Sequence, residues 1–224
     1  MPRLDAWLVE TGRFRSRQTA KRAIRDGLVT VDGKIAKPST QVRGTEMVDL
    51  SRVSDVLMGH DKLSCLDDIL AGSLISPGDK ALDIGSSAGG FLEYLLERGA
   101  ITKGIEISVR FAGPLMQLAS TRQNLSVVFA DAFKIDPLTL FNVNELDLLL
   151  IDVTTTPEGT VILIERFSQL LKHGGRLIAA FKSKPVPLAI TMLADRVSEL
   201  GYTDVHTMVL DDSRQEVHVT AIHM

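Results

Sequence analysis

Four charged residues in the second part of the chain have the types and positions needed for proton chemistry. Lys62 opens a helix-like segment, and Asp152 and Lys182 each end an apolar run typical of a buried strand. Glu216 begins the last strand-like run. Burial lowers the pKa of a lysine and makes it a base or a strong polariser, whereas a nearby carboxylate raises that pKa. The sequence leaves open which effect prevails, but it makes these four residues the candidate catalytic group.

A glycine-rich turn at residues 82–91, LDIGSSAGGF, has the pattern of a cofactor-binding turn between a strand and a helix. Asp83 closes the strand, and the glycines after it let the backbone turn sharply and approach a ligand. A dinucleotide-binding G-x-G-x-x-G would need a glycine where Ser87 stands, so we expect a nucleotide-like cofactor of another kind. The candidate binding residues in this turn are Asp83, Gly85, Ser86, Ser87, Gly89, Gly90 and Phe91.

Acidic residues at the ends of the next two strands extend this candidate site. Glu106 lies 23 positions after Asp83, close to the offset of about 20 for a carboxylate that binds ribose hydroxyls. Asp131 ends the third strand, where it can accept a hydrogen bond from the exocyclic amine of an adenine. The alternative is that both carboxylates are simply solvated strand ends. Ala132 and Asp152 complete the candidate cofactor-binding residues.

The elements that must hold these residues alternate between helix and strand from Leu63 onward. Hydrophobic residues make up 45% of the 224 residues and charged residues 24%, which is typical of a globular protein with a sizeable core. The expected strands are 80–84, 103–107, 126–130, 146–153, 176–181 and 217–222, with helices over 63–71, 90–98, 114–121, 161–171 and 188–200. This alternation predicts an α/β fold with a mostly parallel sheet covered on both faces.

The first fifty residues have a different pattern and an excess of positive charge. We expect helices over Leu4–Glu10 and Arg17–Asp26, then a hairpin turn at Asp32-Gly33. Residues 1–59 contain 11 basic and 7 acidic residues, whereas residues 60–224 contain 14 and 21. We therefore predict a small basic domain over 1–50, a connector over 51–60 and a larger acidic domain over 61–224.

Several classes of protein are excluded by the composition. No apolar run approaches the roughly 18–20 residues of a membrane span. The N-terminal MPRLDAWLVE is charged where a signal peptide is apolar. The one cysteine, Cys65, gives neither an internal disulfide nor a zinc-site spacing, so we expect no metal and a reducing, cytoplasmic setting.

The cofactor turn resembles the first motif of S-adenosylmethionine-dependent methyltransferases, whose fold is a Rossmann-like, seven-stranded sheet. The order Lys62, Asp152, Lys182, Glu216 is similar to the catalytic tetrad of the FtsJ-like ribose 2′-O-methyltransferases. Two segments depart from that family, namely MGHD before the first lysine and VTTTP after the aspartate. The resemblance covers about residues 62–224 and implies S-adenosyl-L-methionine as the cofactor.

The FtsJ-like resemblance implies an in-line displacement in which a ribose 2′-hydroxyl attacks the methyl carbon of the sulfonium. It implies that Lys182 removes or steers the hydroxyl proton, and that Asp152 and Glu216 orient the lysines. Lys62 would hold the hydroxyl and nearby negative charge. The alternative chemistry, methylation of a base nitrogen, commonly uses an (Asp/Asn)-Pro-Pro-(Tyr/Phe)-like element, and this chain has Asp-Val-Thr-Thr in that place.

The N-terminal segment resembles the S4 RNA-binding domain through Arg3-Leu4-Asp5, Ser16-Arg17, Gly27 and the run VTVDGK. Its basic residues can bind RNA phosphates and recognise RNA by shape. The lone Trp7 fits a core position better than a base-stacking one. The candidate RNA-binding residues are Arg13, Arg15, Arg17, Lys21, Arg22 and Arg25.

An S4 domain followed by an FtsJ-like domain is the layout of the TlyA-like, or hemolysin-like, proteins. This resemblance implies that the chain methylates ribosomal RNA. Two other functions stay open, a non-catalytic RNA-binding or ribosome-assembly factor and a membrane-active hemolysin. The second is disfavoured because the chain has no strongly basic amphipathic helix.

Overall fold

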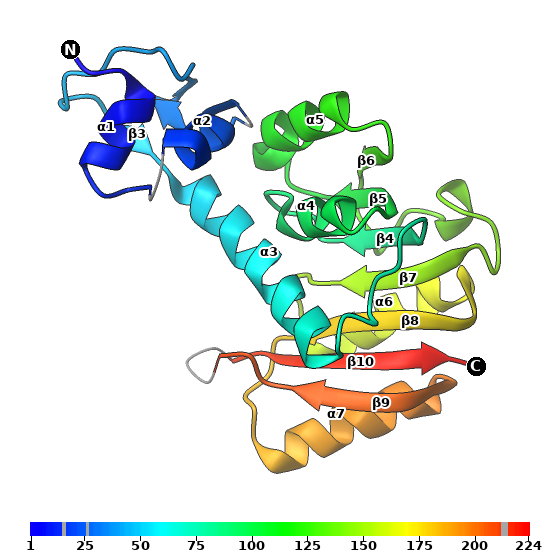
Figure 1. Cartoon of the computed structure of the whole chain (residues 1–224). Coiled ribbons are helices and arrows are strands. Elements are labelled where there is room, and N and C mark those ends of the chain that lie inside the picture. Colours follow the sequence, from blue (N-terminus) through cyan, green and yellow to red (C-terminus); the bar gives the residue numbers. More distant parts are fainter. Residues whose placement is uncertain (15–16, 26, 212–214) are drawn as a thin grey trace.

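The computed structural model describes residues 1–14, 17–25, 27–211 and 215–224. Figure 1 shows a small N-terminal unit joined by one long helix to a large domain built around a twisted sheet.

The central sheet has seven strands in the order β6-β5-β4-β7-β8-β10-β9. Strands β6, β5, β4, β7 and β8 run parallel to one another, and β10 is antiparallel to both of its neighbours. The carboxyl ends of β4 and its parallel neighbours therefore lie at the same edge as the beginning of β10. The strands are β4 (Lys80–Ile84), β5 (Ile101–Glu106), β6 (Leu125–Phe129), β7 (Leu146–Ile151), β8 (Leu171–Phe181), β9 (Tyr202–Met208) and β10 (Val217–His223).

Helices cover both faces of this sheet, which confirms the predicted fold class. One buried cluster joins β4, β7, β8 and β10 to α6 and α7, and another packs α3 and α4 on the opposite face. The helices are α3 (Ser51–Ile69), α4 (Gly90–Glu97), α5 (Ala112–Thr121), α6 (Pro157–Ser168) and α7 (Pro187–Glu199), with short 3-10 turns η1 (Val109–Phe111) and η2 (Pro137–Thr139).

The N-terminal unit contains two helices and a three-stranded sheet of order β2-β1-β3. Asp32 and Gly33 both have positive φ, 50° and 75°, as the predicted two-residue hairpin requires. Gly27 and Ile35 of this unit lie against α5 of the large domain. The unit therefore packs on the large domain and is also connected to it through α3. Its elements are α1 (Leu4–Glu10), α2 (Arg17–Arg25), β1 (Thr30–Val31), β2 (Lys34–Ile35) and β3 (Val48–Asp49).

Several element ends differ from the expected ones by a few residues, for example β8 begins at Leu171, where a helix over 161–171 was expected, and two differences are larger. The connector 51–60 is helical and continuous with the expected helix, so Lys62 lies in the middle of α3 rather than at its start. Strand β9 was not expected, because it is an edge strand whose sequence is polar and lacks apolar alternation. The domain boundaries near residues 50 and 61 stay a prediction.

Candidate active site

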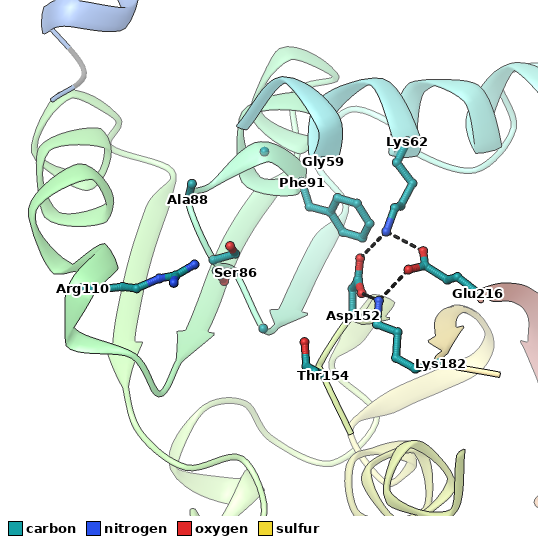
Figure 2. Close-up of a pocket in the computed structure, with 13 residues that line it drawn as sticks. Gly59, Lys62, Ser86, Ala88, Phe91, Arg110, Asp152, Thr154, Lys182 and Glu216 are labelled. Carbon is teal, nitrogen blue, oxygen red and sulfur yellow. Dashed lines mark hydrogen bonds and ion pairs between the residues drawn. The ribbon is translucent and has the colours of Figure 1, made fainter. Parts of the chain in front are cut away.

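The four candidate catalytic residues form a closed square of alternating charge at the carboxyl edge of the sheet (Figure 2). The Lys62 ammonium donates to Asp152 Oδ2 at 2.7 Å and to Glu216 Oε1 at 2.6 Å. The Lys182 ammonium donates to Asp152 Oδ1 at 2.6 Å and to Glu216 Oε2 at 2.7 Å. Each lysine therefore bridges both carboxylates, and we call this group the charge square.

Sheet topology explains why these distant residues meet. Asp152 directly follows β7, and Lys182 directly follows the parallel neighbour β8. Glu216 directly precedes β10, and the antiparallel register that pairs Val217 with Phe181 brings it beside Lys182. Helix α3 crosses this edge of the sheet and supplies Lys62 from above.

Electrostatics in the charge square favour the ionised form of every group whose shift is resolved. Burial alone would raise the pKa of Asp152, but Lys62 and Lys182 lower it below its usual value. Burial likewise opposes the charged form of Lys182, yet Asp152 and Glu216 raise its pKa above the usual value. The sequence left open whether burial or nearby carboxylates would prevail at the lysines. At Lys182 the carboxylates prevail, and the raised pKa favours the ammonium ion over the free base.

The glycine turn forms one wall of a cavity of about 270 Å³ that ends at the charge square. Gly85 has φ +91°, and a side chain there would collide with the backbone carbonyl of Asp152. Ser87 also has a positive φ, 49°, and its amide donates to Glu106 at 2.7 Å. The cavity is lined by Gly59, Lys62, Gly85, Ser86, Ser87, Ala88, Gly90, Phe91, Arg110, Asp152, Thr154, Lys182 and Glu216.

Asp83 lies below this turn and is fully buried. Neither of its carboxylate oxygens has a hydrogen-bond partner among the described residues. Burial, together with the charges of Asp152 and Glu106, raises its pKa to about 7. A buried carboxyl without a partner is costly. Asp83 is not among the residues that line the cavity, so its contact with a cationic or donating ligand stays a prediction.

The other predicted cofactor residues lie at the expected strand ends but outside the cavity lining. Glu106 is buried and accepts the amides of Ser87 and Ser108, each at 2.7 Å. Asp131 accepts the amide of Phe133 and pairs with Lys134, which together lower the pKa of its carboxyl. Gly89, with φ +93°, is the N-cap residue before α4, and Ala132 is buried in the core. Their contacts with a cofactor stay predictions.

Four residues line the cavity that the sequence did not indicate. Gly59 of α3 lies against Gly90, where an added Cβ would come within 3.2 Å of the Gly90 Cα. Arg110 stacks on the Phe111 ring, 4.3 Å from its centroid. Ala88 and Thr154 complete the set. Only Arg110, a cation soon after an acidic strand end, has a residue type that sequence reasoning could have singled out.

The VTTTP loop, which departs from the FtsJ-like pattern, has a structural explanation. Thr156 caps α6 by accepting the amide of Gly159 at 3.2 Å, and Pro157 occupies the first turn of that helix. Thr155 packs against Gly159, so only Thr154 of the three threonines reaches the cavity. The loop therefore begins α6 four residues earlier than predicted.

The candidate RNA-binding residues centre on α2. Arg17, Lys21 and Arg25 follow one another at four-residue spacing, which places them on one side of the helix. The buried carboxylate of Asp5 lies 3.1 Å from Arg17 and 3.7 Å from Lys21. Despite its burial, the arginines beside Asp5 lower its pKa to about 2, so it stays charged and holds these cations.

The remaining RNA-binding candidates are placed in part. Arg13 stacks on the Trp7 ring at 4.7 Å, and Trp7 itself is partly buried against the core of this unit. Arg15 lies outside the described residues, and the Arg22 side chain is not among those described. No described helix is long and apolar enough to cross a membrane.

The fold and the site together define a Rossmann-like domain of the S-adenosylmethionine-dependent methyltransferase type. Residues 62–206 match the fibrillarin family model, which covers more than half of the chain, and the protein belongs to this family. Residues 2–48 match the model of the S4 domain. The predicted combination of an S4 domain with a methyltransferase domain is confirmed. The family model that matches is fibrillarin, whereas the four charged residues resemble the tetrad of FtsJ-like enzymes.

Two curated relatives are 2′-O-methyltransferases of ribosomal RNA by name. The 16S/23S rRNA (cytidine-2′-O)-methyltransferase TlyA of Mycobacterium tuberculosis is 41% identical over 102 residues. That alignment covers 44% of this chain and only 37% of the relative. The fibrillarin-like rRNA/tRNA 2′-O-methyltransferase of Methanospirillum hungatei is 28% identical over 155 residues, which is 69% of this chain and 73% of that protein.

Solved structures confirm the fold. Fibrillarin of Aeropyrum pernix, in complex with natively bound S-adenosyl-L-methionine, superposes with a TM-score of 0.57 at 20% identity, covering 66% of this chain and 68% of that one. The fibrillarin pre-rRNA processing protein of Methanococcus jannaschii gives a TM-score of 0.56 at 21% identity, with 67% and 68% covered.

Proposed function

We propose that this protein is an S-adenosyl-L-methionine-dependent methyltransferase that acts on a ribose 2′-hydroxyl in ribosomal RNA. The observation that carries this proposal is the charge square at the end of a glycine-lined cavity. Two ammonium groups and two carboxylates in mutual contact suit the binding and deprotonation of a hydroxyl group. The TlyA and fibrillarin-like relatives, which are described as rRNA 2′-O-methyltransferases, support the same reaction.

The cavity and its surroundings fit the cofactor. S-adenosylmethionine has an ammonium and a sulfonium group and no phosphates, and the unpartnered Asp83 supplies a buried carboxyl for positive charge. The missing Cβ of Gly85 leaves room for close approach to the backbone. When bound, this cofactor supplies an electrophilic methyl group. Asp83, the Gly85–Phe91 turn and Glu106 would hold it.

The charge square would position the acceptor. A ribose hydroxyl that displaces one lysine–carboxylate contact accepts a hydrogen bond from the ammonium and donates one to the carboxylate. Methylation makes the hydroxyl proton very acidic, so Asp152 or Glu216 would be able to accept this proton although both are weak bases. Lys182 acts by orientation, consistent with its raised pKa, and most of the rate enhancement comes from positioning.

The basic side of α2 would supply RNA affinity. Its cations lie on the unit that packs against α5, and we propose that RNA held by this unit extends to the charge square. A ribosomal RNA substrate also implies that the protein works in the cytoplasm.

Transfer of a labelled methyl group tests this proposal. Purified protein is incubated with labelled S-adenosylmethionine and ribosomal RNA from cells that lack the protein. We expect incorporation that is lost when Lys62 is replaced by Ala. Cofactor binding without incorporation, into free RNA or assembled subunits, would instead favour an RNA-binding or assembly factor on a methyltransferase scaffold.

A further inference from the structure

His218 is a buried imidazole directly behind the charge square. Side chains two positions apart along a strand point to the same face, so His218 in β10 follows Glu216 on the face that α3 covers. The strand register pairs it with Ala180 of β8 and Met208 of β9. Only 2% of His218 is exposed, so its ring is withdrawn from solvent.

The His218 ring approaches the Glu216 carboxylate closely. Its Nε2 lies 2.7 Å from Glu216 Oε1, the same oxygen that accepts from Lys62 at 2.6 Å. The ring nitrogen is within ion-pair distance but is not aligned for a hydrogen bond, and Nδ1 has no partner among the described residues. Burial has therefore cost the imidazole its hydrogen bonds to water, and no hydrogen bond to the protein replaces them. A small rotation of the ring that lets Nε2–H donate to Glu216 would be favourable.

A second cavity of about 260 Å³ borders the His218 ring. Lys62 and Glu216 line this cavity as well as the first one. The groups that line it are Asp61, Lys62, Cys65, Leu210, Asp211, Glu216 and His218.

Substrate binding creates a need for such a donor. In the structure both lysines hold Glu216, one on each oxygen. A hydroxyl that takes the place of Glu216 on Lys62 leaves Oε1 of this carboxylate without its lysine donor. A buried carboxylate that loses a donor is strongly destabilised unless another group replaces it. His218 is already within reach of the Lys62-bound oxygen.

We propose that His218 is a positioning residue that holds Glu216 in place when the substrate hydroxyl displaces a lysine contact. This inference rests on the proposed function and goes beyond the four-residue square.

The test compares three substitutions in the full-length protein. In His218→Gln the side-chain amide nitrogen can take the place of Nε2, whereas His218→Asn is too short and His218→Leu has a similar bulk without a donor. Thr220→Val is the control, because Thr220 is buried one step further along the same face. The measurements are kcat, the KM values for RNA and cofactor, calorimetric cofactor affinity and thermal stability.

We expect His218→Leu and His218→Asn to lower kcat about ten- to hundredfold, as for loss of a hydrogen bond to a charged group. The KM values and the cofactor affinity should stay unchanged, and His218→Gln and Thr220→Val should stay near wild type. If the leucine protein does not fold, the glutamine and asparagine proteins decide. Equal kcat in the glutamine and asparagine proteins would overturn the proposal. An inactive wild-type protein with normal cofactor affinity would instead contradict the proposed function.

Discussion

At the scale of residues, the protein combines two buried charge arrangements with opposite properties. The charge square contains equal numbers of positive and negative groups, so each charge is compensated at 2.6–2.7 Å. Asp83 is buried without compensation, and its pKa rises to about 7. Under the proposed function, the first arrangement would bind an uncharged hydroxyl, and the second would be completed by a cationic ligand.

Replacement of Lys182 by Ala tests the charge square directly. We expect methyl transfer to fall about 10²–10⁴-fold, since orientation of the hydroxyl and support of both carboxylates are lost. Cofactor affinity measured by calorimetry should stay the same. The control is Lys184→Ala, two residues away and exposed. Near-normal turnover in the Lys182 variant would remove this lysine from the mechanism.

The raised pKa of Asp83 predicts how pH affects the protein without its cofactor. The folded carboxyl, with a pKa of about 7, binds protons more tightly than the unfolded one at 3.8. The free energy of unfolding should therefore fall as pH rises from about 4 to about 7. Denaturant titrations of the wild type and of Asp83→Asn, at several pH values, measure this difference.

Cofactor affinity should show the opposite trend. A cationic cofactor binds the ionised Asp83, so affinity should weaken by up to about tenfold per pH unit below about 7. Calorimetry at about pH 6 and about pH 8 should show this difference in the wild type and a smaller one in Asp83→Asn. An identical pH dependence in both proteins would exclude Asp83 as the cause.

At the scale of elements, the strand ends were the most predictable part of the site. Each candidate catalytic residue except Lys62 lies directly beside a strand, and apolar runs locate strands well. The position of Lys62 in α3 was missed because residues 51–60 show little periodicity, and the helix forms through packing on α4 rather than through its own pattern. Gly59 was missed for the same reason.

The close contact between α3 and α4 predicts that a larger side chain at Gly59 will disturb the active site through α3. Gly59→Val should overpack against Gly90 and push α3, with Lys62, away from the sheet. Overpacking of this kind costs about 1–3 kcal/mol, and kcat should fall more than cofactor affinity. The control is Asp68→Val, which places the same valine at an exposed position of α3. Equal losses in both variants would show that the contact with Gly90 is not their cause.

At the scale of the whole molecule, the proposed function assigns RNA binding to the basic N-terminal unit and chemistry to the acidic larger domain. The charge asymmetry of the sequence indicated this division, and the S4 match at residues 2–48 agrees with it. The sequence could not predict that this unit packs against α5 through Gly27 and Ile35, because such contacts depend on the shapes of the two domain surfaces.

The basic side of α2 predicts salt-dependent RNA affinity. Joint replacement of Arg17, Lys21 and Arg25 by Ala should weaken RNA binding and reduce the slope of log affinity against log salt by roughly 0.7–0.9 for each lost phosphate contact. Cofactor affinity should not change. The charge-matched control replaces exposed cations of the large domain, namely Lys134, Lys172 and Arg196. A similar change of slope in the control would assign RNA binding to the large domain.

The most direct test of the central claim is the chemical identity of the methylated product. Ribosomal RNA from cells with and without this protein is digested to nucleosides and analysed by mass spectrometry, and the modified position is mapped by its resistance to alkaline cleavage. We predict one or a few 2′-O-methylated riboses that are absent without the protein and absent when Lys182 is replaced by Ala. Methyl groups on bases, or identical patterns in all three RNAs, would contradict the account.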